Sequence, residues 1–180
     1  MSAGAPLRTV EEQLGDVLAA VRPLPTARVA LAEATGATLR EPVRAALDIP
    51  VFDNSAMDGF AVRFADVAHA SPAAPVILRV VADLPAGTAD DPPLAAGEAA
   101  RIMTGSPVPS DADAIVPFED TAGGLSDSLQ TATVQRAPRS AGAFVRRAGD
   151  DLRSGDVVLE AGMMLGPLQV AAATAAGRTH

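Results

Sequence analysis

The chain has 180 residues and a net charge of −8, from 22 acidic and 14 basic side chains, and this balance excludes broad nucleic-acid binding, which needs a basic surface. It contains no cysteine and only two histidines, which excludes disulfides and thiolate metal sites and argues against a histidine metal site. Because no run of 18 apolar residues is present and the N-terminus has no signal-peptide pattern, we expect a cytoplasmic protein without a membrane partner.

The first predicted element is a helix over Thr9–Val21. Thr9 can accept a hydrogen bond from the backbone of Glu12, whose side chain can reach back and complete a capping box. Pro23 and Pro25 end the helix. Its apolar residues fall on one face, which needs a partner: Val10, Leu14, Val17, Leu18 and Val21.

The remainder of the chain reads as β-rich, because it contains 15 glycines, 15 prolines and many short β-branched segments. Strands are predicted at Arg28–Leu31, Val76–Leu84, Ala99–Met103, Ala114–Val116, Thr131–Gln135 and Asp156–Leu159. Irregular structure is predicted for residues 1–8, Phe64–Pro75 and Ala122–Gln130. A second helix is predicted over Pro167–Ala176, with proline at its first position and Gly177 just past its end.

The segment Pro50–Arg63 carries the densest group of polar side chains. Short apolar pieces bracket the sequence D-N-S-A-M-D-G, so we expect a strand end, a polar loop and a strand start. Its carboxylates are Asp53 and Asp58, and Gly59 permits a tight turn. The residue types alone leave two interpretations open, an ordinary exposed turn and a ligand-binding loop.

Two later segments also have polar residues at predicted turns. Arg101–Thr121 reads R-I-M-T-G-S-P-V-P-S-D-A-D-A-I-V-P-F-E-D-T, and its T-G turn exposes a hydroxyl beside backbone N–H groups. We expect Arg101 to point to the opposite strand face from Thr104, which favours a surface or interface ion pair for Arg101. Val145–Gly155 reads V-R-R-A-G-D-D-L-R-S-G, and its adjacent carboxylates could form a salt-bridged corner with the preceding arginines.

D-N-S-A-M-D-G-F-A-V and the two later segments, in this order, resemble the signatures of the MoeA/gephyrin E-domain family, the molybdopterin molybdenumtransferases. The resemblance extends from about Thr9 to Gly177. One departure is Asp111, which stands where the family motif has glycine. We expect Asp111 to preserve the turn by adopting a left-handed conformation, which aspartate tolerates better than most residues.

The resemblance implies an α+β, β-rich fold with flanking helices. It consists of an N-terminal helix (9–22), a discontinuous first module (26–46 and 143–177) and an inserted β-barrel-like module (47–142). The family's MogA-like catalytic module and C-terminal β module are expected to be absent from this chain.

The implied function is insertion of molybdate into adenylylated molybdopterin, which forms molybdenum cofactor and releases AMP. We expect the 180 residues alone to be inactive, to form a homodimer through the N-terminal modules and to act with a MogA-like module of the parent chain. An alternative is a dimerisation or scaffold module without catalysis of its own. A free-standing barrel that binds a small anion is a third possibility.

Site residues are carried over from the motif positions of the family. Asp58, Thr104 and Asp151 are predicted to be catalytic, and Asn54, Ser55 and Gly105 to bind substrate. A divalent cation, Mg²⁺, is expected at Asp58 and Asp151, because Mg²⁺ prefers carboxylate, phosphate and water oxygens. Glu119 and Asp120 also match a motif, and a role in holding the fold is equally consistent with them.

Overall fold

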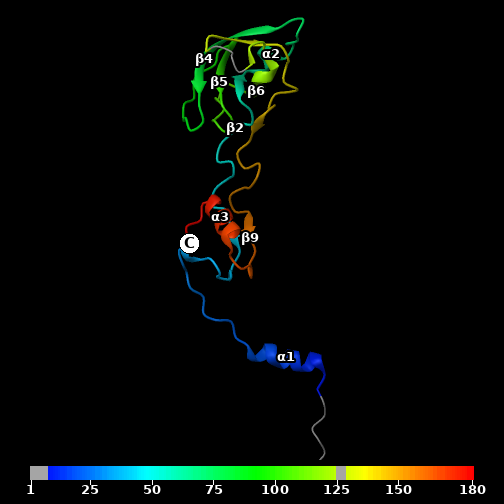
Figure 1. The fold of residues 1–180 in the computed structure, drawn as a ribbon, viewed down its shortest axis with the longest axis vertical. Helices are drawn as coiled ribbons and strands as arrows, with labels where there is room; N and C mark the ends of the chain where they lie inside the picture. Colours follow the sequence, from blue (N-terminus) through cyan, green and yellow to red (C-terminus); the bar gives the residue numbers. More distant parts are fainter. Residues whose placement is uncertain (1–7, 125–128) are drawn as a thin grey trace, which may run out of the picture.

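A computed structural model describes residues 8–124 and 129–180. The predicted irregular start, apart from its last residue, and the middle of the predicted loop Ala122–Gln130 lie outside the described residues. The protein is β-rich with few helices, and it has two bodies joined by two chain segments, with helix α1 (Val10–Ala20) standing apart (Figure 1). We call residues 54–146 the sheet body, residues 31–47 with 153–179 the α3 body, and residues 48–53 with 147–152 the neck.

The sheet body is built on five strands in the spatial order β6-β3-β5-β4-β7. They are β3 (Gly59–Val62), β4 (Val76–Leu84), β5 (Glu98–Ile102), β6 (Ala114–Pro117) and β7 (Thr131–Val134). Strands β4 and β5 run parallel and the other neighbours run antiparallel. The sheet curls into a half barrel (Figure 1). Four of the six strands predicted from the sequence form part of this sheet. For Val76–Leu84 the predicted and observed bounds are the same.

Both faces of the sheet are covered, as the interior strand β3 shows. Its side chains alternate, so Phe60 and Val62 join one hydrophobic cluster and Ala61 joins another. All four residues of β3 and all four of β6 are buried. In the first cluster the ring of Phe118 meets that of Phe60 edge to face, with 5.3 Å between their centroids.

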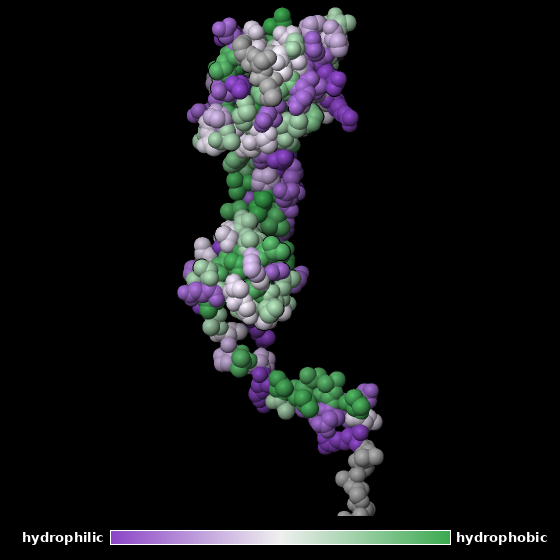
Figure 2. Space-filling model, viewed as in Figure 1, coloured by the Kyte–Doolittle hydropathy of each residue, from purple (hydrophilic) through white to green (hydrophobic). Residues whose placement is uncertain are grey.

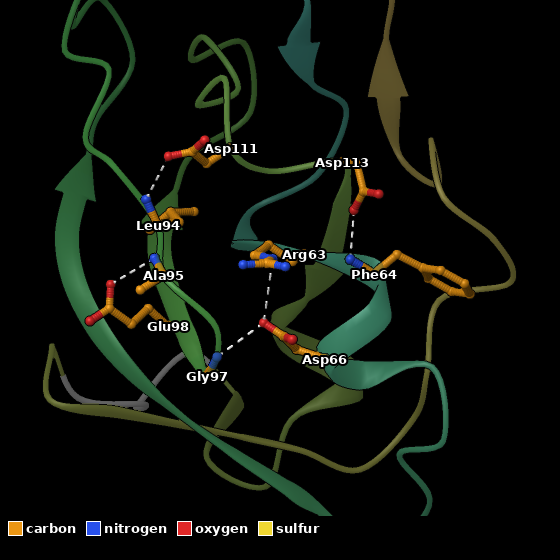
Figure 3. Close-up of polar contacts among 9 residues, drawn as sticks. All are labelled: Arg63, Phe64, Asp66, Leu94, Ala95, Gly97, Glu98, Asp111 and Asp113. Carbon is orange, nitrogen blue, oxygen red and sulfur yellow. Dashed lines mark hydrogen bonds and ion pairs between the residues drawn. The ribbon is translucent and has the colours of Figure 1, made fainter.

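Carboxylates on one side of the sheet body hold its connections by accepting backbone hydrogen bonds (Figure 3). Asp113 accepts from the N–H of Phe64 at 2.6 Å and so caps helix α2 (Phe64–Val67). The prediction of irregular structure from Phe64 was therefore wrong for this turn, because the capping group lies 49 positions away in the sequence. Asp66 likewise accepts from the N–H of Gly97 at 3.0 Å.

Asp111 does not behave as the sequence suggested. In the described part of the chain, Phe144 is the only residue other than glycine that has a positive φ. Asp111 therefore does not adopt a left-handed conformation. Its carboxylate instead accepts a hydrogen bond from the N–H of Leu94 at 3.1 Å (Figure 3). The aspartate therefore anchors the β4–β5 connection, which a glycine at this position could not do.

The α3 body has its own small core. Strand β1 (Val43–Arg44) pairs antiparallel with β9 (Val157–Leu159), next to the 3₁₀ turn η1 (Leu31–Glu33) and helix α3 (Pro167–Ala175). Its buried apolar residues are Leu31, Ala34, Leu159, Leu165 and Ala173. The predicted strand at Arg28–Leu31 is absent, because residues 28–30 lie exposed without a neighbouring strand and Leu31 already opens η1.

Helix α1 has the predicted capping box. The N–H of Glu12 donates to the hydroxyl of Thr9 at 3.1 Å, and the N–H of Thr9 donates to the Glu12 carboxylate at 2.9 Å. No residue of the helix is buried, and its predicted apolar face forms an exposed stripe (Figure 2). Among the described residues, no helix combines the length and the apolar character needed to cross a membrane.

The close packing of β3 on β6 predicts a strict requirement for glycine at position 59. A Cβ atom there would lie 2.1 Å from the carbonyl oxygen of Val116 and 2.9 Å from the Cα of Pro117, both rigid backbone atoms. We expect Gly59→Ala to lower the free energy of unfolding by about 3 kcal/mol or more, measured by urea denaturation followed by circular dichroism.

Gly15→Ala is the matched control, because a Cβ at Gly15 meets nothing within 4 Å. We expect it to leave the urea midpoint of the sheet body unchanged while raising the helicity of α1, since alanine is favoured over glycine in a helix by about 1 kcal/mol. Equal midpoints for the two variants would contradict the packing argument.

Candidate functional site

The two turns that carry the first two motifs lie against each other. The N–H of Ser55 donates to the carbonyl of Ser106 at 3.0 Å, and the N–H of Gly105 donates to the carbonyl of Ser55 at 2.8 Å. The N–H of Val108 donates to the carbonyl of Asp53 at 3.1 Å. These three bonds join the D-N-S-A-M-D-G loop to the T-G-S-P turn along their backbones. The structure thus brings Asn54, Ser55, Asp58, Thr104 and Gly105 into one region.

Asp58 and Thr104 are in direct contact at the surface of this region. One carboxylate oxygen of Asp58, Oδ1, accepts from both the N–H and the hydroxyl of Thr104, each at 2.7 Å. These two bonds, the N–H first and the hydroxyl second, lower the pKa of Asp58 from its ordinary value of 3.8. In the part of the chain that the structure describes, no hydrogen bond engages the other oxygen, Oδ2. Asp58 therefore presents a fixed, ionised carboxylate with one oxygen available.

Backbone geometry places this pair. Gly105 adopts a φ of +84°, which turns the chain directly after Thr104. On the other side, the carbonyl of Asp58 accepts from the N–H of Phe118 at 3.1 Å, where β6 ends. Asp58 is thus held between β5 and β6, directly before β3 begins.

Asn54 and Ser55 lie beneath the surface of the loop in strand β2 (Asn54–Ser55), which pairs with β8 (Val145–Arg146). Both are buried. The amide of Asn54 donates to the carbonyl of Phe52 at 3.1 Å, and the hydroxyl of Ser55 donates to the carbonyl of Met57 at 2.5 Å. These contacts shape the loop, and the substrate-binding role of both residues stays a prediction.

Asp151 lies in the neck and is exposed. Its N–H donates to the carbonyl of Ile49 at 2.9 Å, where the two neck segments run side by side. Within the described residues, no hydrogen bond links its carboxylate to Asp58 or Thr104. The structure therefore unites two of the three predicted catalytic residues and leaves the third on a separate segment.

The predicted corner of arginines and adjacent carboxylates forms differently. The guanidinium of Arg147 pairs with Asp53 at 2.5 Å, and only the backbone N–H of Arg147 donates to the Asp150 carboxylate, at 2.7 Å. The carboxylate of Asp53 also accepts from the N–H of Ala148 at 2.8 Å. The Ala148 and Arg147 bonds both lower the pKa of Asp53.

Asp53 is a residue whose contacts sequence reasoning missed. Its partners Arg147 and Ala148 follow 94 and 95 positions later, so no local pattern could reveal them. The one available signal was the presence of Asp53 in the same polar loop as Asp58.

Two further motif residues have structural partners. The Nε of Arg101 lies 3.9 Å from the Asp83 carboxylate, which confirms the predicted ion pair, and its guanidinium lies over the Phe118 ring at 5.7 Å from the centroid. Asp120 pairs with Arg136 at 3.0 Å and so holds the fold, whereas Glu119 is exposed.

The carboxylates of this chain do not by themselves form a metal-binding cage. Across residues 8–124 and 129–180, no group of three or more histidine, aspartate or glutamate side chains is arranged to hold a metal ion. The donor that fits a cation is the available oxygen of Asp58. One carboxylate matches the way proteins bind Mg²⁺, because that ion keeps water and substrate phosphate as most of its ligands.

By its fold and site, the protein is a β-rich half barrel whose acidic loop is joined to a T-G turn. The family model described as "MoeA N-terminal region (domain I and II)" matches residues 8–177, and the chain belongs to this family.

Curated relatives agree with this assignment. Molybdopterin molybdenumtransferase 2 of Mycobacterium tuberculosis is 43% identical over 174 residues, which is 95% of this chain and 41% of the relative. Molybdopterin molybdenumtransferase of Synechococcus elongatus is 43% identical over 166 residues, which is 89% of this chain and 40% of the relative. The chain thus spans about 40% of the length of these relatives.

A solved structure shares the fold. The crystal structure of the molybdopterin biosynthesis moeA protein from Pyrococcus horikoshii OT3 matches with a TM-score of 0.75 and 34% sequence identity. The match covers 83% of this chain and 38% of that protein.

The contact between Asp58 and Thr104 predicts a measurable titration. Because both bonds favour the ionised carboxylate, the stabilisation is complete above pH 3.8 and is lost as the pH falls through the lowered pKa of the folded protein. In Thr104→Val the hydroxyl bond disappears and the N–H bond remains, so we expect the pKa of Asp58 to rise while staying below 3.8. Carboxyl ¹³C shifts followed against pH by NMR measure it.

Thr88→Val provides the control, because the Thr88 hydroxyl accepts from the N–H of Asp90 and is not among the groups that bond Asp58. It should leave the Asp58 titration unchanged. An Asp58 pKa that is the same in Thr104→Val as in the unaltered protein would show that the hydroxyl bond does not form in solution.

Proposed function

We propose that this chain is the N-terminal part of a molybdopterin molybdenumtransferase and supplies one wall of the site where molybdate enters adenylylated molybdopterin and AMP is released. The observation that carries the proposal is the contact of Asp58 with Thr104, which joins two family motifs into one exposed, ionised group. The names of the curated relatives and the family match support it.

We propose that this wall compensates the negative charge of the substrates by holding a cation. Molybdate and the adenylyl phosphate are both anions, and an ionised Asp58 would repel them unless a cation lies between. Oδ2 of Asp58 is our proposed protein contact for Mg²⁺. Asp151 is kept as a second proposed carboxylate, although in this structure it lies in the neck without a contact to Asp58. When bound, such an ion neutralises phosphate charge. Thr104 holds Asp58 in its ionised form and fixes the direction of its available oxygen.

The other walls are proposed to come from outside these residues. We propose that the α3 body and the sheet body correspond to the first and inserted modules implied by the family resemblance, and that a MogA-like module supplies most of the pterin contacts. The 180 residues alone are then inactive. The coverage of about 40% of the relatives' length is consistent with this division.

Asp58→Asn tests the site, in the protein encoded by the complete open reading frame. The substitution keeps the size of the side chain and its acceptor for Thr104 but removes the charge, so we expect turnover of adenylylated molybdopterin and molybdate to fall at least about tenfold, since loss of one charge contact costs more than about 1.4 kcal/mol. Formation of AMP and of molybdenum cofactor is measured at fixed Mg²⁺.

Asp91→Asn is a matched control. The Asp91 carboxylate accepts from the hydroxyl and N–H of Ser110 at 2.7 and 2.8 Å, and its pKa is lowered in the same way, but it lies in the β4–β5 connection. We expect this variant to keep full turnover. Equal loss in both variants would indicate a general effect of the charge, and full turnover in Asp58→Asn would rule out the assigned role. Full turnover in Asp151→Asn would remove Asp151 from the site.

We also propose that the protein forms a homodimer through its N-terminal part, supported by the apolar face of α1. Val10, Leu14, Val17, Leu18 and Val21 are between 49% and 79% exposed, which is unfavourable for a helix that remains alone in water. We expect Val17→Asp to shift the protein toward monomer, because it places a charge in the centre of that face.

Analytical ultracentrifugation over a range of concentrations measures this shift. Ala19→Asp is the control, because Ala19 lies on the opposite face of the same helix. The substitution introduces the same negative charge as Val17→Asp. Identical sedimentation of both variants and the unaltered protein would show that α1 takes no part in assembly.

A further inference from the structure

The two bodies of the protein are separate in their packing. The buried residues of the sheet body form two hydrophobic clusters and those of the α3 body form a third, and the three share no residue. None of the neck residues, 48–53 and 147–152, belongs to any of the clusters. In Figure 2 the neck is visibly narrower than either body. The angle between the bodies therefore depends on the contacts of the neck and not on a shared core.

Within the neck, the two segments are tied to each other by backbone hydrogen bonds. The N–H of Ile49 donates to the carbonyl of Leu152 at 2.7 Å, the N–H of Leu152 donates back to Ile49 at 3.1 Å, and the N–H of Gly149 donates to the carbonyl of Pro50 at 3.0 Å. These bonds stiffen the neck as a ribbon. Directly beyond the neck, the same two segments pair as β2 and β8 and so enter the sheet body.

Asp53 lies where the ribbon meets the sheet body, beside the hydrogen bond from the Asn54 amide to the carbonyl of Phe52. Its carbonyl accepts from the N–H of Val108, which belongs to the sheet body, at 3.1 Å. Its carboxylate accepts from Arg147 and from the N–H of Ala148, both on the returning segment, at 2.5 and 2.8 Å. One residue thus connects the outgoing segment, the returning segment and the sheet body.

We propose that Asp53 and Arg147 form a clasp that holds the two neck segments together where they enter the sheet body, and that this limits the angle between the neck and the sheet body and so the direction in which the sheet body presents Asp58 and Thr104. Hinges in proteins are a few loop residues that absorb the change in backbone angles, and the joint at Asp53 has this character. Surface ion pairs contribute little to global stability, so opening the clasp changes the angle without unfolding either body. The inference rests on contacts alone and holds whether or not the proposed reaction is correct.

The test measures the separation of the two bodies with spin labels. Because the chain has no cysteine, Ile77→Cys in β4 and Ala171→Cys in α3 provide two unique labelling sites. Both positions are exposed. Double electron–electron resonance then gives the distribution of distances between the bodies. We expect Arg147→Gln and Asp53→Asn each to widen this distribution about twofold, because a second angle becomes populated.

Arg136→Gln is the matched control, because Arg136 also pairs with an aspartate and is more than half exposed, but its partner Asp120 lies in the sheet body. It should leave the distribution unchanged, and Arg147→Lys, which keeps the charge, should stay closer to the unaltered protein than Arg147→Gln does. A second pair of labels, Ile77→Cys with Ala86→Cys inside the sheet body, should keep its separation in every variant.

Three results would overturn the proposal. One is an unchanged distribution in both Arg147→Gln and Asp53→Asn. Another is equal widening in Arg136→Gln. The third is widening of the internal Ile77–Ala86 pair, which would show local unfolding of the sheet body in place of a change in angle.

Discussion

The close approach of β3 to β6 at Gly59 is the constraint on which the rest of the site depends. The space beside Gly59 is too small for a Cβ atom, so the backbone of the acidic loop leaves the sheet at one fixed place. Asp58 is the preceding residue, and its carbonyl is held by the N–H of Phe118. Its carboxylate consequently meets Thr104 at the end of β5. The contact between two motifs 46 positions apart thus follows from how tightly three strands pack.

Carboxylates that accept backbone N–H groups recur throughout the protein. Asp53, Asp58, Asp66, Asp91, Asp111 and Asp113 all do so. A chain rich in loops leaves many N–H groups outside regular ladders, and a buried or half-buried N–H group needs an acceptor. Part of the net charge of −8 therefore has a structural use in this fold. The same device makes the site residue Asp58 and the neck residue Asp53 chemically alike, although the first lies directly before β3 and the second at the joint.

The protein divides into two bodies that have separate hydrophobic clusters. The sheet body has apolar clusters on both faces of its sheet, and the α3 body has a small cluster of its own. The neck is held by backbone hydrogen bonds and by the ion pair of Asp53 with Arg147. The Asp58–Thr104 pair lies wholly within the sheet body, so its two hydrogen bonds do not depend on contacts of the neck or the α3 body.

The sequence by itself determined the elements whose signals are local and the family to which they belong. Val76–Leu84 was recognisable from its β-branched residues, α1 from its capping box and α3 from Pro167 and Gly177. The motifs around Asp58 and Thr104 were recognisable because they are contiguous. Only the tertiary structure decided that Asp113 caps α2, that Asp111 anchors Leu94 and that Arg147 pairs with Asp53. The physical reason is that each of these hydrogen bonds joins residues far apart in the chain, and their geometry is set by strand packing that no local pattern records.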